Sequence, residues 1–213
     1  MTRRILVLLA VAALSACGAD NEYASDAEVA QARFVADAPP SITLFTVLST
    51  RNGSGAHSGL LINGSERIMF DPAGTWQHPR LPERHDVHFG ITDKMIAYYI
   101  DYHARVTYDV REQTVLVTPE QAAIAMARAK AYGAVPKTQC ARSLSTILAG
   151  VPGFESIGGT LSPKKLSKDF AAIPGASSKI ITDDDDDNNH GVLLIQANGD
   201  PLDKPASPAA PAP

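Results

Sequence analysis

The sequence has 213 residues, with 23 acidic side chains against 19 Lys and Arg side chains, and 45% of its residues are hydrophobic. A formal charge of −4 at pH 7 argues against nucleic acid as a partner. The length is sufficient for one domain with a hydrophobic core.

The N-terminus has the pattern of a secretory signal. Arg3 and Arg4 precede an apolar run over residues 5–14, and the small-residue sequence LSAC ends the signal. The apolar run is shorter than the roughly 20 residues of a membrane-spanning helix, so we expect none in the mature protein. Removal of the two arginines moves the formal charge to −6.

The LSAC sequence resembles the lipobox of bacterial lipoproteins, in which the cysteine is acylated and becomes the new N-terminus. This resemblance implies that Cys17 attaches the protein to a membrane through lipid. Gly18 after the cysteine resembles the default signal for the outer membrane, facing the periplasm. The alternative is an ordinary signal peptide in which Cys17 is incidental.

Composition divides the chain into four segments. We expect a lipoprotein signal peptide over 1–16, a flexible tether over 17–40, a single domain over 41–197, and a disordered Pro/Ala-rich tail over 198–213. The tether is rich in Ala, Asp and Glu. The acidic run Asp183–Asp187 lacks the alternating ligands and glycine of an EF-hand, so we interpret it as a solvated, self-repelling loop and not a calcium site.

Strand patterns dominate the first half of the domain. Residues 41–49, 57–62 and 66–71 are rich in β-branched and aromatic side chains, and the last two runs flank a turn at 63–65. Both faces of this hairpin carry apolar residues, which predicts a central position in the sheet. Further strands are predicted over 105–117, 179–181 and 192–195.

Helical patterns begin at residue 92. Helices are predicted over 92–103, from the capping box at Thr118 to about Tyr132, from Cys140 to Gly150, and from Ser162 to about Ile173. Together these elements predict an α+β fold in which an antiparallel sheet packs against helices.

Cys140 is the single cysteine that remains once Cys17 is assigned to lipidation. With Thr138 as the predicted N-cap, Cys140 lies in the first turn of its helix, where the helix dipole favours a thiolate. Apolar residues at +4, +7, +8 and +11 place Cys140 on the buried face of the helix. The pattern therefore fits both a reactive thiol and an inert buried cysteine.

A nucleophilic thiol requires a base and a polar group that orients the base. His57 opens the strand over 57–62, and Gly59 on the same face leaves room beside its imidazole. A three-residue hairpin loop at 63–65 places Asp71 opposite His57, whereas a two-residue loop places Phe70 there instead. The sequence leaves both registers open.

The order of His57, Asp71 and Cys140, on a strand, the next strand and a later helix, resembles the circularly permuted branch of the NlpC-type papain-like superfamily. That superfamily includes lecithin retinol acyltransferase-like enzymes and bacterial lipoproteins. The resemblance covers residues 57–151 and implies a permuted papain-like core. It also implies Cys140 as nucleophile, His57 as general base and Asp71 as orienting group, with no cofactor or metal ion. Many relatives have a His or another polar group in place of Asp71.

A second histidine cluster lies over residues 78–88, "HPRLPERHDVH". His78, His85, Asp86 and His88 offer zinc-ligand chemistry, but the interrupting prolines and arginines favour an irregular loop. One of these histidines is also an alternative to Asp71 as the third catalytic group. Trp76 nearby either stacks on substrate or belongs to the core or rim.

Two functions follow from the sequence. The first is an envelope thiol hydrolase or acyltransferase that cleaves an amide or ester through a Cys140 thioester, with peptidoglycan peptides or acyl lipids as the nearest substrates. The second is a non-catalytic envelope lipoprotein that uses the fold for binding or scaffolding. A close pair of His57 and Cys140 favours the first.

Overall fold

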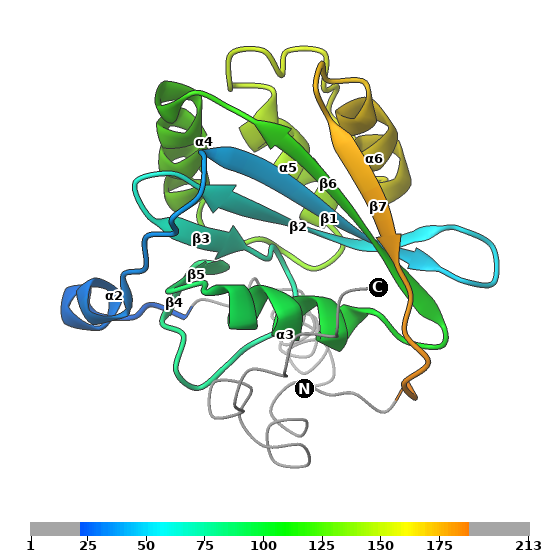
Figure 1. The fold of residues 1–213 in the computed structure, drawn as a ribbon, viewed down its shortest axis with the longest axis horizontal. Helices are drawn as coiled ribbons and strands as arrows, with labels where there is room; N and C mark the ends of the chain where they lie inside the picture. Colours follow the sequence, from blue (N-terminus) through cyan, green and yellow to red (C-terminus); the bar gives the residue numbers. More distant parts are fainter. Residues whose placement is uncertain (1–21, 188–213) are drawn as a thin grey trace, which may run out of the picture.

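The computed structural model describes residues 22–187 (Figure 1). The predicted signal peptide, Cys17, the strand predicted over 192–195 and the tail predicted over 198–213 lie outside the described residues. Within them the chain is an α+β protein with a seven-stranded antiparallel sheet and five helices. None of these helices has the length and apolar character that a membrane span requires.

The sheet has the order β4-β5-β3-β2-β1-β6-β7, and all neighbours are antiparallel. The predicted hairpin is therefore central, as its two apolar faces indicated. The strands are β1 (Ser41–Ser49), β2 (Gly55–Asn63), β3 (Arg67–Phe70), β4 (Glu83–Arg84), β5 (Val87–Phe89), β6 (Tyr108–Leu116) and β7 (Ser177–Ile181).

Strand alternation gives the sheet two apolar faces, each covered by helices (Figure 1). Leu44, Leu60 and Ile62 face α4 (Pro119–Tyr132), α5 (Cys140–Leu148) and α6 (Pro163–Ala171). Phe45 and Leu61 face α3 (Asp93–His103) on the other side. Both faces of the central strands are therefore removed from water, and this burial drives the fold.

Helix boundaries follow local sequence signals. Thr118 and Gln121 form the predicted capping box of α4, and the Ser162 side chain caps α6. At the end of α5, the Arg128 side chain donates to the carbonyls of Thr146 and Ile147 at 2.8 and 2.9 Å. A Cβ atom at Gly150 would overlap the Arg128 guanidinium, so the glycine makes room for this cap.

From residue 22 onward, the segment predicted as a flexible tether contains regular structure and contacts the domain. Residues 26–32 form helix α2 (Asp26–Ala32), which begins with a capping box of Ser25 and Glu28. The backbone of Phe34 then accepts a hydrogen bond from the backbone of Arg67 at 2.9 Å. The Ser-x-x-Glu signature was visible in the sequence, but the Ala/Asp/Glu composition hid it.

The histidine-rich segment over 78–88 also differs from the irregular loop that the sequence predicted. It contains strand β4 and all of strand β5 except Phe89, and both strands extend the sheet beside β3. Asp86 between them is buried and accepts hydrogen bonds from the backbone N–H groups of Ala73 and Val135 at 3.2 and 2.7 Å. This carboxylate therefore links three parts of the chain.

Helix α5 depends on its apolar side for its position over β2. Leu144 is fully buried in the core shared with α4, α6 and the sheet. We expect Leu144→Ala to lower the free energy of unfolding by about 2–5 kcal/mol, because it removes buried methyl groups and leaves a cavity. Arg142→Ala, on the exposed side of the same helix, should change it by less than about 0.5 kcal/mol. Urea denaturation measures both, and equal effects would contradict this packing.

Candidate functional site

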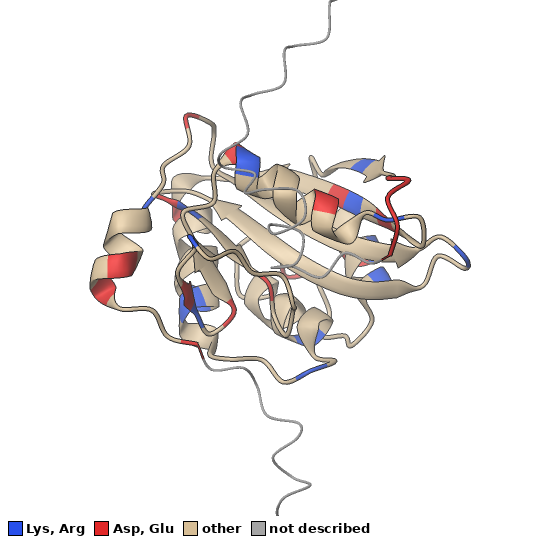
Figure 2. Cartoon of the chain, turned by 90° about the horizontal axis from the view of Figure 1, so that it is seen from below, with Lys and Arg blue, Asp and Glu red and all other residues tan. Residues whose placement is uncertain are grey.

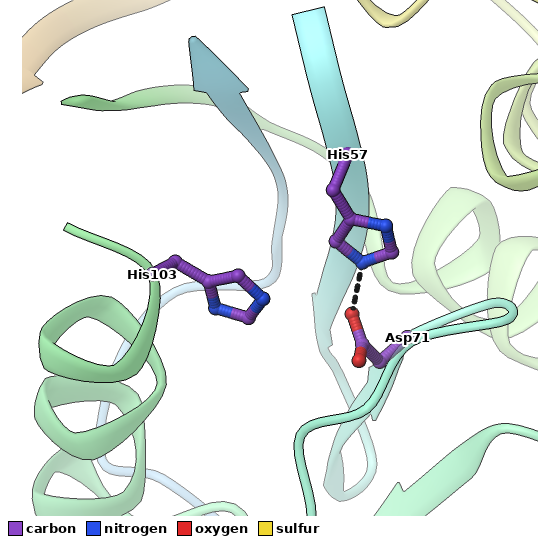
Figure 3. Close-up of side chains that lie close together, drawn as sticks. All are labelled: His57, Asp71 and His103. Atoms are coloured by element: carbon purple, nitrogen blue, oxygen red, sulfur yellow. Dashed lines mark hydrogen bonds and ion pairs between the residues drawn. The ribbon is translucent and has the colours of Figure 1, made fainter. Parts of the chain in front are cut away.

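The thiol, the imidazole and the carboxylate identified in the sequence meet in the structure. Cys140 is the first residue of α5, His57 lies on β2, and Asp71 directly follows β3. His57 Nε2 is 2.6 Å from Asp71 Oδ1 (Figure 3). The side chains of His57 and Cys140 are close enough for each to shift the pKa of the other. Because Nε2 is taken by Asp71, Nδ1 is the nitrogen that remains for the sulfur.

The hairpin register that brings Asp71 to His57 is neither of the two predicted. Asn63 pairs with Arg67 and Leu60 with Phe70, so the turn consists of residues 64–66. Continuing this register places Asp71 opposite Gly59, two residues from His57. Both side chains still lie on one face because side-chain orientation repeats every two residues. The pair is therefore diagonal across the hairpin and not directly opposed.

Gly59 makes the diagonal contact possible. A Cβ atom at this position would overlap the Tyr99 hydroxyl and lie 3.2 Å from Asp71 Oδ1. Tyr99 uses the free space to donate a hydrogen bond to Asp71 Oδ1 at 2.8 Å. The room that the sequence predicted beside the imidazole is therefore occupied by a second donor to the carboxylate.

Two side chains of α3 belong to this cluster and were not predicted. Tyr99 and His103 are four residues apart, so both lie on the helix side that faces the sheet. The His103 ring stacks on the His57 ring, with centroids 5.5 Å apart and an angle of 9° between the planes. The i, i+4 spacing was the one sequence signal for the pair, but it does not reveal which strand the helix covers.

The environment of the thiol favours its ionised form. Burial raises the pKa of Cys140, but hydrogen bonding to His57, the charge of His57 and the backbone N–H groups of Ser58 and Ala141 lower it below the usual value. Cys140 is buried, with 7% of its surface exposed. Ser58 lies beyond the last residue pair of β2 and β3, where the sheet leaves this edge of β2 open to α5.

The imidazole and the carboxylate stabilise each other's charge. Burial lowers the pKa of His57, but the charge and hydrogen bond of Asp71, followed by those of Cys140, raise it above the usual value. Burial likewise raises the pKa of Asp71, and the charge and hydrogen bond of His57 lower it below the usual range. At pH 7 His57 is therefore an imidazolium and Asp71 a carboxylate, and the thiolate fraction of Cys140 is larger than that of an ordinary thiol.

His103 and His88 titrate differently from His57. Burial lowers the pKa of each to about 4, with Asp71 opposing the shift, so both are neutral at pH 7. His103 therefore adds no positive charge next to His57. One uncharged and one charged imidazole thus lie stacked beside the same carboxylate.

The N-cap predicted for α5 is wrong. Thr138 lies one residue before the N-cap, Gln139, which makes no side-chain capping bond. Thr138 instead adopts a φ of 72°, a left-handed conformation that is uncommon for a β-branched residue. Cys140 is nevertheless the first helical residue, and its apolar partners along the helix are buried as predicted.

The alternative sites lie elsewhere. Asp71, and not one of the histidines over 78–88, hydrogen-bonds to His57 Nε2. His78 Nδ1 accepts from the Arg80 backbone at 3.1 Å. Trp76 is 2% exposed and makes edge contacts with His88 and Tyr99, so it belongs to the core and does not offer a stacking surface.

The acidic run Asp183–Asp187, drawn in red in Figure 2, is mostly exposed, but several contacts attach it to the rest of the chain. The Asp185 carboxylate lies 3.3 Å from the Arg105 guanidinium, and its backbone oxygen accepts from Val106. Asp187 accepts from the Thr107 hydroxyl. These contacts attach the run to the turn before β6.

The chain matches no known protein-family model, no curated protein and no solved structure.

Gly59→Ala tests the packing that holds the site together. The new methyl group must displace Tyr99, and we expect the free energy of unfolding to fall by roughly 1–3 kcal/mol. Gly159→Ala is the matched control, because no atom lies within 4 Å of a Cβ there. Its effect should be neutral or slightly stabilising. Urea denaturation of both variants is the measurement, and a neutral Gly59→Ala would contradict the close approach of Tyr99.

Proposed function

We propose that this protein is a thiol hydrolase or acyltransferase that cleaves an amide or ester through a thioester on Cys140. The observation that carries this proposal is the connected set of side chains Cys140, His57, Asp71 and Tyr99. A nucleophile, a base and an orienting group in contact are the parts that covalent catalysis requires. An inert core cysteine needs none of them.

In the first half of the reaction, the Cys140 thiolate attacks the carbonyl carbon of the substrate. The carbonyl π electrons move to oxygen, and the backbone N–H of Cys140 at the start of α5 is the proposed donor to this oxyanion. When the tetrahedral intermediate collapses, the bond to the leaving amine or alkoxide breaks. His57 Nδ1 gives its proton to that group, and a thioester remains.

In the second half, water or another acceptor attacks the thioester. His57 Nδ1, now neutral, takes a proton from the acceptor, and the Cys140 thiolate departs. Water gives a free acid, whereas an alcohol or amine gives a transferred acyl group. Asp71 keeps Nε2 occupied throughout, so Nδ1 stays directed at the sulfur.

At the level of fold, we propose a permuted papain-like core. Three features support this proposal: the antiparallel sheet, a cysteine at the first position of a helix packed on it, and a chain order in which His57 and Asp71 precede Cys140. The α5 helix packs directly on β2, the strand that carries His57. This is the arrangement expected from the resemblance to the NlpC-type branch.

The proposed place of action is the bacterial envelope. The signal-like sequence and Cys17 support a lipid anchor, with Gly18 favouring the outer membrane. Peptide stems of peptidoglycan and acyl lipids are the amides and esters nearest to such an anchor. We therefore propose them as the substrate classes.

Alkylation of Cys140 by iodoacetamide tests the proposal directly. We expect the rate near pH 7 to exceed that of an ordinary thiol, because the thiolate fraction is larger. His57→Gln should lower the rate at pH 7, since it removes the largest favourable influence on the thiolate. His85→Asn is the matched control, because His85 lies outside the site at a φ of 49°, which Asn tolerates. Mass spectrometry of the intact protein against time measures the rates.

A slow rate in the folded wild-type protein, similar to His57→Gln, would contradict the proposal. It would favour the alternative of a non-catalytic envelope lipoprotein. Circular dichroism of each variant distinguishes loss of reactivity from loss of the fold.

Asp71→Asn tests the coupling between the carboxylate and the thiol. Asp71 raises the pKa of His57, so its removal should let His57 lose its proton at lower pH. The thiolate then loses its cationic partner, and the pKa of Cys140 should rise. We expect the pH profile of alkylation to shift upward by about 1 unit or more. An unchanged profile in a folded variant would show that Asp71 does not act on the thiol through His57.

A further inference from the structure

Three metal-ligating side chains converge on the Nε2 side of His57, away from the sulfur. A ring nitrogen of His57, a ring nitrogen of His103 and a carboxylate oxygen of Asp71 lie within 4.8 Å of one another (Figure 3). One other such group occurs among residues 22–187, and it consists of the carboxylates of Asp101, Asp183 and Asp185 alone. The group with two imidazoles and one carboxylate is more selective for transition-metal ions than the group of three carboxylates, because imidazole nitrogen favours these ions.

We propose that His57, Asp71 and His103 form a binding site for a divalent transition-metal ion such as Zn²⁺, in a state of the protein that excludes thiol catalysis. Two histidines and one carboxylate with an open fourth position are a known ligand set for zinc. Metal binding itself does not depend on the proposed hydrolase activity. The predicted inhibition does, because it requires His57 to be the base.

His103 is already oriented as a metal ligand. Its Nδ1 is 2.8 Å from the backbone oxygen of Tyr99, and a carbonyl can only accept, so Nδ1 carries the proton. Nε2 then has a free lone pair, and Figure 3 shows the ring directed toward His57 and Asp71. A backbone carbonyl that fixes the tautomer in this way is a common outer partner of zinc-binding histidines.

Asp71 has an unused acceptor. Oδ1 accepts from Tyr99 and contacts His57, whereas Oδ2 is buried without a hydrogen-bond partner in the described structure. The carboxylate side chain is fully buried. A buried carboxylate with one unpartnered oxygen carries a desolvation cost, and a cation bound through Oδ1 would offset part of it.

Binding requires a small rearrangement. Metal bonds of about 2.0–2.2 Å in tetrahedral geometry place ligand atoms roughly 3.3 Å apart. His57 Nε2 and Asp71 Oδ1, now 2.6 Å apart, must therefore separate slightly, and the ion replaces the proton between them. His103 must lie at the same spacing from both atoms. The proton relay and the bound ion are thus mutually exclusive.

A pocket reaches His103 from the surface. It has a volume of about 540 Å³ and is lined by His103, Tyr102 and Val47, and Val47 is the partner of His57 on the neighbouring strand β1. His57 is itself 16% exposed in its side chain. Water in this pocket could complete the coordination of the ion.

Titration with Co²⁺, followed by visible and near-ultraviolet absorption, tests the site in the folded protein. We expect one ion per chain, tetrahedral ligand-field bands, and no thiolate-to-cobalt charge-transfer band. Zn²⁺ should displace the Co²⁺ with the same stoichiometry. Cys140→Ser should retain binding, which separates this outcome from failure of the proposed function.

His103→Phe keeps a ring beside His57 but removes both nitrogens. We expect it to weaken Zn²⁺ binding by more than the roughly 10–100-fold that loss of an outer-shell partner costs. His85→Asn is again the control and should bind as the wild type does. In wild type, Zn²⁺ should also slow alkylation of Cys140, and His103→Phe should relieve this inhibition.

Three results would overturn the metal site: no stoichiometric binding to the wild type, a thiolate charge-transfer band, or undiminished binding by folded His103→Phe. The second would assign the ion to Cys140 and His57 instead. If His103→Phe does not fold, two other results would overturn the site. These are undiminished metal binding by folded Asp71→Asn and a thiolate charge-transfer band in the wild-type cobalt spectrum.

Discussion

The site depends on one buried interaction, the contact between the Asp71 carboxylate and the His57 imidazole. A carboxylate without solvent exposure costs several kcal/mol unless it is paired. Pairing with His57 and the Tyr99 hydroxyl offsets this cost and fixes the ring. Because Nε2 is occupied, Nδ1 is directed to Cys140. The pKa of the thiol therefore depends on a carboxylate that does not itself contact the sulfur.

The two faces of the sheet contribute different parts of the site. Helix α3 on one face supplies Tyr99 and His103, and helix α5 on the other supplies Cys140. The parts meet because β2 extends beyond the residues that pair with β3, which leaves the backbone of Ser58 available to the sulfur. Changes in the packing of either helix therefore act on the same imidazole.

The sequence predicted the central strands, the capped helix α4 and the buried side of α5, because each has a strong local pattern. One of the two registers that it left open placed His57 and Asp71 on the same face, and this relation holds because the observed register differs from that one by two residues, which preserves side-chain orientation. The register itself was wrong, because the position of the turn within residues 63–66 depends on packing across the sheet. Tyr99 and His103 were missed because their role also depends on packing: no local sequence signal indicates which strands α3 covers. Helix α2 was missed because composition was given more weight than its capping signature.

The ionisation states of His57 and Cys140 at neutral pH are the most direct test of the central claim, and nuclear magnetic resonance of the labelled side chains measures them. A positively charged ring beside a sulfur whose pKa lies below that of an ordinary thiol is the predicted result, with the ring charge persisting well above pH 6.5. A neutral ring beside a protonated sulfur at pH 7 would contradict it.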